Sequence, residues 1–180
     1  MSEMRIPQQS LYVYPVMEGA SPTAHTFEQA CRDLASRLRF DHAGSPAEAT
    51  VALAPLLTRK LAPGEWSAPL MGTLIFHPSA LPLHRGPDAI RRTLAARERV
   101  SAASWFWCDA GLDTGPLCEQ ELVVLDLEER ARDAYARRFI PAALRALTRA
   151  LIGIAQGTPR RVEQEHRLAT YEPALPKRAA

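Results

Sequence analysis

The segment Gly72-Thr-Leu-Ile-Phe-His77-Pro-Ser-Ala-Leu-Pro82 decides the fold of this chain. Its apolar run predicts a buried strand that ends at His77, and the prolines after it predict a loop. A second segment, Asp109-Ala-Gly-Leu-Asp113-Thr-Gly-Pro116, predicts a tight loop directly after another apolar strand. Open α/β sheets build their binding sites from the ends of neighbouring strands. We therefore expect His77 and Asp113 to lie beside each other in an active site.

The rest of the chain alternates short apolar segments with helical patterns. The pattern predicts strands near residues 11–17, 50–53, 72–76, 100–107 and 117–125. It predicts helices over residues 23–40, 88–97 and 126–156, the last divided or kinked at Pro141, and one or two helical turns within residues 56–66. Such alternation predicts an α/β sandwich with a mostly parallel sheet of four or five strands. We expect the aromatic strand Trp105-Phe106-Trp107 to lie in the core.

Composition limits the partners that we expect. The 180 residues favour one domain, and 22 basic and 20 acidic residues give a net charge of +2. Nucleic-acid binding would need basic residues concentrated on one face, so no nucleic acid is expected. The chain has no apolar run of about 18 residues and shows no signal-peptide pattern, so we expect a cytoplasmic protein without a membrane segment.

The cysteines Cys31, Cys108 and Cys118 are odd in number and have no Cys-x-x-Cys spacing. They predict neither a disulfide framework nor a zinc site, and no metal is expected. Cys31 falls on the apolar side of a predicted helix, which favours a packing role. Cys108 adjoins the Asp109 loop, where a reactive thiol is an alternative to packing.

Two motifs carry a resemblance to a known family. Residues 74–86, with His77-Pro-Ser-Ala-Leu-Pro82 followed by Arg85-Gly86, resemble the first signature of the folate-dependent formyltransferases. Asp109-Ala-Gly-Leu-Asp113-Thr-Gly resembles their second signature. From about Pro55 to Tyr171 the chain resembles the N-terminal hydrolase domain of 10-formyltetrahydrofolate dehydrogenase. The resemblance implies a compact, Rossmann-like formyltransferase fold with a truncated N-terminal half and a catalytic domain over residues 1–160. The prolines and scattered charge near the end of the chain predict a strap or flexible tail over 161–180.

The resemblance also implies a donor substrate and roles for individual residues. The donor would be 10-formyltetrahydrofolate, and no metal would be needed. His77 would stabilise an oxyanion or shuttle a proton, and Asp113 would orient His77 and accept the proton of the nucleophile. The implied folate-binding residues are Arg59, Lys60, Leu61, Ala62, Ile75, Cys108, Asp109, Ala110, Gly111 and Leu112. The alternative is that His77 is a core histidine and that Asp113 caps a turn with Thr114.

The sequence departs from most of the family at Ile75, where an asparagine is usual. Side chains alternate along a strand, so Ile75 shares a face with His77 and occupies the place of an oxyanion donor. Loss of one such donor typically costs about 2.7–4 kcal/mol. The hydrolase domain of the dehydrogenase also has isoleucine here, so water or a thiol must be considered as acceptor beside an amine.

The acceptor region is also reduced. Between Met17 and the first predicted helix only Gly19 is a glycine, so a phosphate-binding turn and a nucleotide acceptor are not expected. No C-terminal barrel is recognisable, which disfavours methionyl-tRNA. The first hypothesis is formyl transfer to a small amine of the amino-sugar or hydroxylated amino-acid type. A 10-formyltetrahydrofolate hydrolase and a folate-binding accessory module are the alternatives, and a homodimer stays open.

Overall fold

The computed structural model describes residues 11–16, 21–171 and 173. In these residues one six-stranded sheet has the order β2-β1-β3-β4-β5-β6. The strands are β1 (Leu11–Pro15), β2 (Phe40–His42), β3 (Val51–Ala54), β4 (Thr73–His77), β5 (Val100–Trp107) and β6 (Leu117–Val124). The first four in this order pair in parallel, whereas β4–β5 and β5–β6 are antiparallel. The expected α/β class with a mainly parallel sheet is confirmed, but the antiparallel β4–β5 pairing was not predicted.

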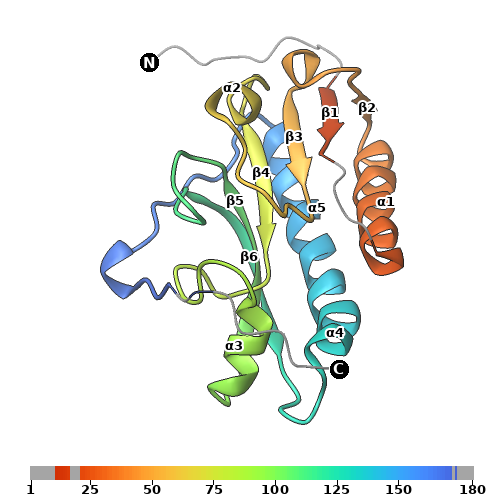
Figure 1. The fold of residues 1–180 in the computed structure, drawn as a ribbon. Helices are drawn as coiled ribbons and strands as arrows, with labels where there is room; N and C mark the ends of the chain where they lie inside the picture. The colour runs from red at the N-terminus through yellow and green to blue at the C-terminus, as the bar shows by residue number, and fades with distance from the viewer. Residues whose placement is uncertain (1–10, 17–20, 172, 174–180) are drawn as a thin grey trace.

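Two long helices pack on one face of this sheet (Figure 1). They are α1 (Pro22–Arg37), whose first turn is capped by Ser21, and α5 (Ile140–Ala155). Their apolar faces enclose a large core with Phe76, Trp105 and Trp107 from β4 and β5. Burial of this aromatic strand confirms the prediction that it belongs to the core.

The remaining helices are short. They are α2 (Pro63–Trp66), α3 (Ala89–Ala95) and α4 (Ala131–Ala134), with single turns at Pro46–Glu48 and His166–Leu168. A π-helical turn, Tyr135–Phe139, joins α4 to α5, and the Ile140 N–H donates to the Tyr135 carbonyl. Pro141 follows directly and has no N–H to donate to an earlier turn. The predicted break at Pro141 is therefore a change of helical pitch within one segment.

One local prediction was met only in part, and one strand was missed. A helical turn lies within residues 56–66 as predicted, but it covers only Pro63–Trp66, and residues 56–62 are not helical. Proline suits the first helical position. The Glu65 carboxylate accepts from the Ala62 N–H at 2.7 Å and stabilises this start. Strand β2 was missed and lies where the first helix was expected to end, because three residues are too few to show an alternating pattern.

The two faces of β4 serve different purposes. Leu74 and Phe76 point into the helix-covered core, whereas Ile75 packs with Ala54, Leu81 and Phe106 on the opposite face. His77 shares the side of Ile75, since side chains alternate along a strand. Loops rather than helices cover this second face, and the site is built there.

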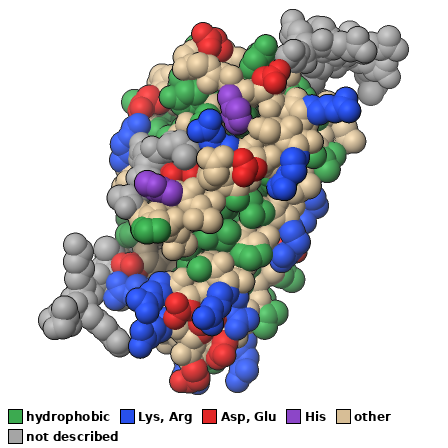
Figure 2. All heavy atoms as spheres, turned by 90° about the vertical axis from the view of Figure 1, so that its right-hand side faces the viewer, with side chains coloured by type: hydrophobic (Ala, Val, Ile, Leu, Met, Phe, Trp, Pro, Cys, Tyr) green, Lys and Arg blue, Asp and Glu red, His purple; other side chains and the backbone are tan. Residues whose placement is uncertain are grey.

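No helix among the described residues is long and apolar enough to cross a membrane. Figure 2 shows the face that carries α1, where basic and acidic side chains are interspersed. That face carries no uniformly basic surface.

Candidate active site

The loop after β5 brings Asp113 to His77. Strands β4 and β5 are antiparallel, and Trp107, at the end of β5, pairs with Leu74 rather than with His77. The expectation that two neighbouring strand ends bring the pair together is therefore wrong. Residues 108–116 instead fold back along the sheet, and Asp113 reaches His77 from the loop.

Close backbone contacts shape this loop. A Cβ on Gly115 would lie 1.8 Å from the Trp107 carbonyl oxygen, so a larger residue does not fit there. The Asp109 carboxylate accepts from the Gly111 N–H at 3.0 Å and from the Thr114 hydroxyl at 2.7 Å. Asp113 adopts a left-handed backbone with φ of 55°, which is uncommon for a residue other than glycine. The loop is a specified structure that presents one carboxylate.

His77 and Asp113 form the centre of the site. Asp113 Oδ2 lies 3.6 Å from His77 Nδ1, and the two side chains are 9% and 12% exposed. His77 Nε2 lies 2.8 Å from the His84 carbonyl oxygen, and because a carbonyl only accepts, Nε2 carries the proton. Nδ1 is then the nitrogen that faces the carboxylate and can take up or return a proton.

Asp113 has a second partner that fixes its side chain. The Gly86 N–H donates to Asp113 Oδ2 at 2.7 Å. The separation of 3.6 Å between His77 and Asp113 is too long for a hydrogen bond, but opposite charges attract at this distance once His77 is protonated. The carboxylate can thus stabilise an imidazolium formed during a reaction.

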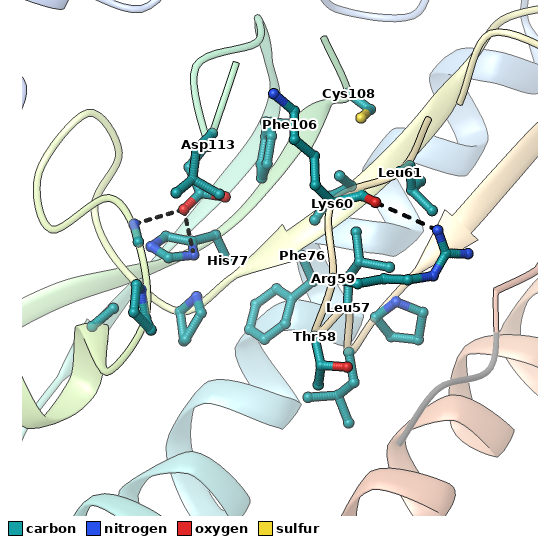
Figure 3. A pocket seen from close by; sticks show the side chains of 18 of the residues that line it. Leu57, Thr58, Arg59, Lys60, Leu61, Phe76, His77, Phe106, Cys108 and Asp113 are labelled. Carbon is teal, nitrogen blue, oxygen red and sulfur yellow. Dashed lines mark hydrogen bonds and ion pairs between the residues drawn. The ribbon is translucent and has the colours of Figure 1, made fainter. Parts of the chain in front are cut away.

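The pair borders a cavity of about 560 Å³, which is within the usual range for a small-molecule site. Ten of the twelve predicted site residues line it: His77, Asp113, Arg59, Lys60, Leu61, Ile75, Cys108, Asp109, Gly111 and Leu112. Figure 3 labels six of them, among them His77 and Asp113. Ala62 and Ala110 are exposed and do not line it. The structure therefore brings together residues from three separate segments, while their individual roles stay predictions.

Other lining residues were not predicted as site residues. Gly86 ends the first motif, and Pro87 and Asp88 follow it directly, so the Arg-Gly ending could have pointed to them. Tyr135 comes from the π-helical turn, and no local pattern marked it. Burial raises the pKa of Tyr135, with smaller contributions from Cys31 and Glu28, so its phenol stays neutral at ordinary pH.

Ile75 forms an apolar wall beside His77. It is 8% exposed and packs against Phe106, Leu81 and Ala54. The hydroxyl of Thr73, two residues earlier, donates to the Trp66 carbonyl at 3.0 Å and is not available to a ligand. The position at which the family usually has an amide donor thus offers only hydrocarbon.

The Cys108 thiol is poorly suited to act as a nucleophile. Burial, together with the negative charge of Asp109, raises its pKa to about 11. The thiolate is the reactive form, so little of this residue is reactive near neutral pH. The structure favours packing over the alternative of a reactive thiol.

The basic residues at the cavity differ in their partners. Arg59 makes a two-pronged contact with Glu65, with nitrogen–oxygen distances of 2.8 and 2.7 Å. These bonds, followed by the backbone bond from Ala62, lower the pKa of the Glu65 carboxyl to about 2. The Lys60 side chain extends across the cavity (Figure 3). Its positive charge lowers the pKa of Cys108, but less than burial raises it.

The fold and this cavity define a Rossmann-like α/β protein with a histidine–aspartate pair in its ligand site. The sequence model of the formyl transferase family matches residues 15–151, and the chain therefore belongs to the formyl transferase family. The resemblance in the two motifs is confirmed.

Two kinds of curated relatives match part of the chain. The mitochondrial 10-formyltetrahydrofolate dehydrogenase of Homo sapiens is 38% identical over 105 residues, 58% of this chain and 11% of that protein. The methionyl-tRNA formyltransferase of Carboxydothermus hydrogenoformans is 38% identical over 121 residues, 66% of this chain and 38% of that protein. The chain thus spans only a minor part of either relative.

Solved structures show the same fold. HypX from Aquifex aeolicus, in complex with tetrahydrofolic acid, has a TM-score of 0.77 at 16% identity, covering 92% of this chain and 30% of that chain. The N-formyltransferase from Helicobacter canadensis, with folinic acid and dTDP-3-aminofucose, has a TM-score of 0.66 at 14% identity, covering 91% and 70%. The chain spans only part of the length of these two neighbours.

Proposed function

We propose that this protein transfers the formyl group of 10-formyltetrahydrofolate to a small amine of the amino-sugar or hydroxylated amino-acid type. The observation that carries the proposal is the His77–Asp113 pair at a ligand-sized cavity. Family membership and the folates named with the solved relatives support the donor. Small molecules are the partners of this reaction, and a homodimer stays a prediction.

The cavity offers suitable surroundings for a folate ring. Residues 59–61, 108–109 and 111–112 line it together with Ile75 and Phe106. A flat heteroaromatic ring needs apolar surface together with backbone donors and acceptors at its edge. In the proposal, 10-formyltetrahydrofolate places its formyl carbon next to His77.

The chemistry then uses the pair as an acid and a base. The amine nitrogen attacks the formyl carbon, and the proton that the amine loses passes to the Asp113 carboxylate, directly or through water. His77, protonated at Nδ1, stabilises the oxyanion of the tetrahedral intermediate. The bond to N10 of the folate breaks, and N10 takes up the proton. The products are a formamide and tetrahydrofolate.

Hydrolysis is the second candidate, and Ile75 favours it. The apolar wall leaves the oxyanion without the amide donor that most of the family has, and water needs no subsite of its own. The same residues would act, with water replacing the amine and formate as the product. A folate-binding module without turnover is the remaining alternative.

Release of tetrahydrofolate from 10-formyltetrahydrofolate, followed by absorbance, tests these proposals. Release that depends on an added amine identifies a transferase, and release in buffer alone identifies a hydrolase. Asp113→Ala should abolish either activity, whereas Asp126→Ala, at an exposed turn outside the cavity, should leave it unchanged. Folate binding without any release would refute the enzyme proposals.

A further inference from the structure

The segment after α5 crosses the loops that carry the site. Val162 exchanges two backbone hydrogen bonds with Leu117, at 2.8 and 2.9 Å. Farther along, the Thr170 hydroxyl accepts from the His84 N–H at 2.7 Å, and the Thr170 carbonyl accepts from the Arg85 N–H at 2.9 Å. Figure 1 shows this segment, in dark blue, passing along the loop side of the sheet. It therefore touches the first residue of β6 and the β4–α3 connection.

Gln164 lies at the centre of this segment and is 4% exposed. Its amide nitrogen donates to the carbonyls of Asp113 and Gly115, at 3.0 and 2.7 Å. Its amide oxygen accepts from Nε and Nη2 of Arg85, at 3.2 and 2.7 Å. One buried side chain thus joins the aspartate loop to the loop that follows His77.

These contacts lie one hydrogen bond away from each member of the His77–Asp113 pair. Arg85 stands between His84, whose carbonyl holds His77 Nε2, and Gly86, whose N–H holds the Asp113 carboxylate. The carbonyl of Asp113, with its left-handed backbone, is held by Gln164. If the amide of Gln164 is removed, a buried guanidinium loses an acceptor and two carbonyls lose their donor. Unsatisfied buried polar groups cost free energy, so the two loops should shift to find other partners.

The charge of Arg85 belongs to the same arrangement. Burial lowers the pKa of its guanidinium, while the carboxylates of Asp113 and Asp109 act in the opposite direction. Arg85 Nη2 also lies 3.0 Å from His166 Nδ1. A buried cation beside the site thus depends on the segment after α5 for its hydrogen bonds.

We propose that Gln164 is a positioning residue, which holds the Asp113 loop against the His84–Gly86 loop and so sets the distance between Asp113 and His77. The catalytic part of this inference rests on the proposed function. A displacement of about 1 Å at a reacting group can cost about 10²-fold in rate. Gln164 lies outside the set of residues that line the cavity, so its loss should affect turnover rather than folate binding.

Amide hydrogen exchange, read by NMR at Gly86, tests the positioning without any substrate. Gln164→Leu removes all four bonds at similar size, and Gln164→Glu keeps an acceptor for Arg85 but loses the donor to Asp113 and Gly115. Each should raise exchange at the Gly86 amide at least about tenfold, because the Asp113 carboxylate no longer holds it. The amides of Phe76 and Trp105, in the interior strands β4 and β5 of the sheet, should stay protected. Glu165→Gln, at an exposed neighbour in the same segment, is the matched control and should change neither.

Kinetics supply the second readout. We expect kcat to fall roughly 10²-fold in both Gln164 variants, with KM for 10-formyltetrahydrofolate within about twofold of the original. Unchanged exchange at Gly86 overturns the inference, as does a rise in KM with kcat intact. A general increase in exchange that includes Phe76 and Trp105 indicates lost stability and also overturns it. Raised Gly86 exchange in a protein without turnover supports the positioning and refutes the proposed function alone.

Discussion

Asp113 Oδ2 lies 3.6 Å from His77 Nδ1 although the strands that precede the two residues run in opposite directions. The contact is made possible by a loop that turns back over the sheet and by the Gly86 N–H, which holds the carboxylate at 2.7 Å. The pair is thus built from three backbone segments, and each of them is a target for mutation.

Replacing the histidine should stop the reaction but leave the fold intact. We expect His77→Asn to lower kcat by about 10²–10³, because loss of one group that stabilises the oxyanion typically costs that much. Tetrahydrofolate affinity, measured by calorimetry, should change little. His25→Asn, on the exposed side of α1, is the control. Full turnover in His77→Asn would contradict the proposed mechanism.

An amide at position 75 should favour amine transfer at the expense of stability. Ile75→Asn places a donor beside His77, and we expect amine-dependent turnover to rise by about 10-fold or more, up to the roughly 10²–10³ typical of an oxyanion donor. The same change puts a polar group into the cluster with Phe106 and Leu81 and should lower the free energy of unfolding by about 1–3 kcal/mol. Ile75→Val, which keeps the wall apolar, should cost only about 0.5–1.5 kcal/mol and leave the acceptor preference unchanged. Equal acceptor preference in all three proteins would refute the role given to Ile75.

The aspartate loop should not tolerate a side chain at Gly115. A Cβ there would lie 1.8 Å from the Trp107 carbonyl oxygen, so Gly115→Ala must move the backbone that carries Asp113. We expect turnover to fall at least about tenfold and exchange at the Gly86 amide to rise. Gly64→Ala is the matched control, because a Cβ at Gly64 meets nothing within 4 Å. If the two variants behave alike, the loop is more adaptable than its contacts indicate.

Alkylation should reveal the protonated state of Cys108. Its pKa is raised to about 11 by burial and then by Asp109, so the thiolate fraction is small below that pH and grows about tenfold per pH unit. We expect iodoacetamide to modify Cys108 slowly at pH 7.5, with a rate that climbs steeply toward pH 10. The urea-unfolded protein, measured by the same mass-spectrometric assay, should react much faster at pH 7.5. Rapid modification of the folded protein at that pH would restore the reactive-thiol alternative.

Local patterns predicted much of this fold. The apolar runs at β4 and β5 and the helical spacing of α1 and α5 determine which face of each element is buried, because side-chain direction follows the backbone period. The motif residues His77 and Asp113 were correctly expected to meet, and ten of twelve predicted site residues line one cavity. Short elements were not predicted correctly. Strand β2 has too few residues to show a pattern, and residues 56–62 lack a signal that separates a loop from a helical turn.

The sequence by itself thus determined the longer helices and strands, the presence of the histidine and aspartate in the two motifs, and the apolar side chain at position 75. Tertiary structure alone decided that β5 runs antiparallel to β4, that Tyr135 reaches the cavity, and that Gln164 joins the two loops. The physical reason is distance along the chain. Gln164 bonds to partners 49 to 79 residues away, and such contacts depend on how the whole core packs rather than on any local period.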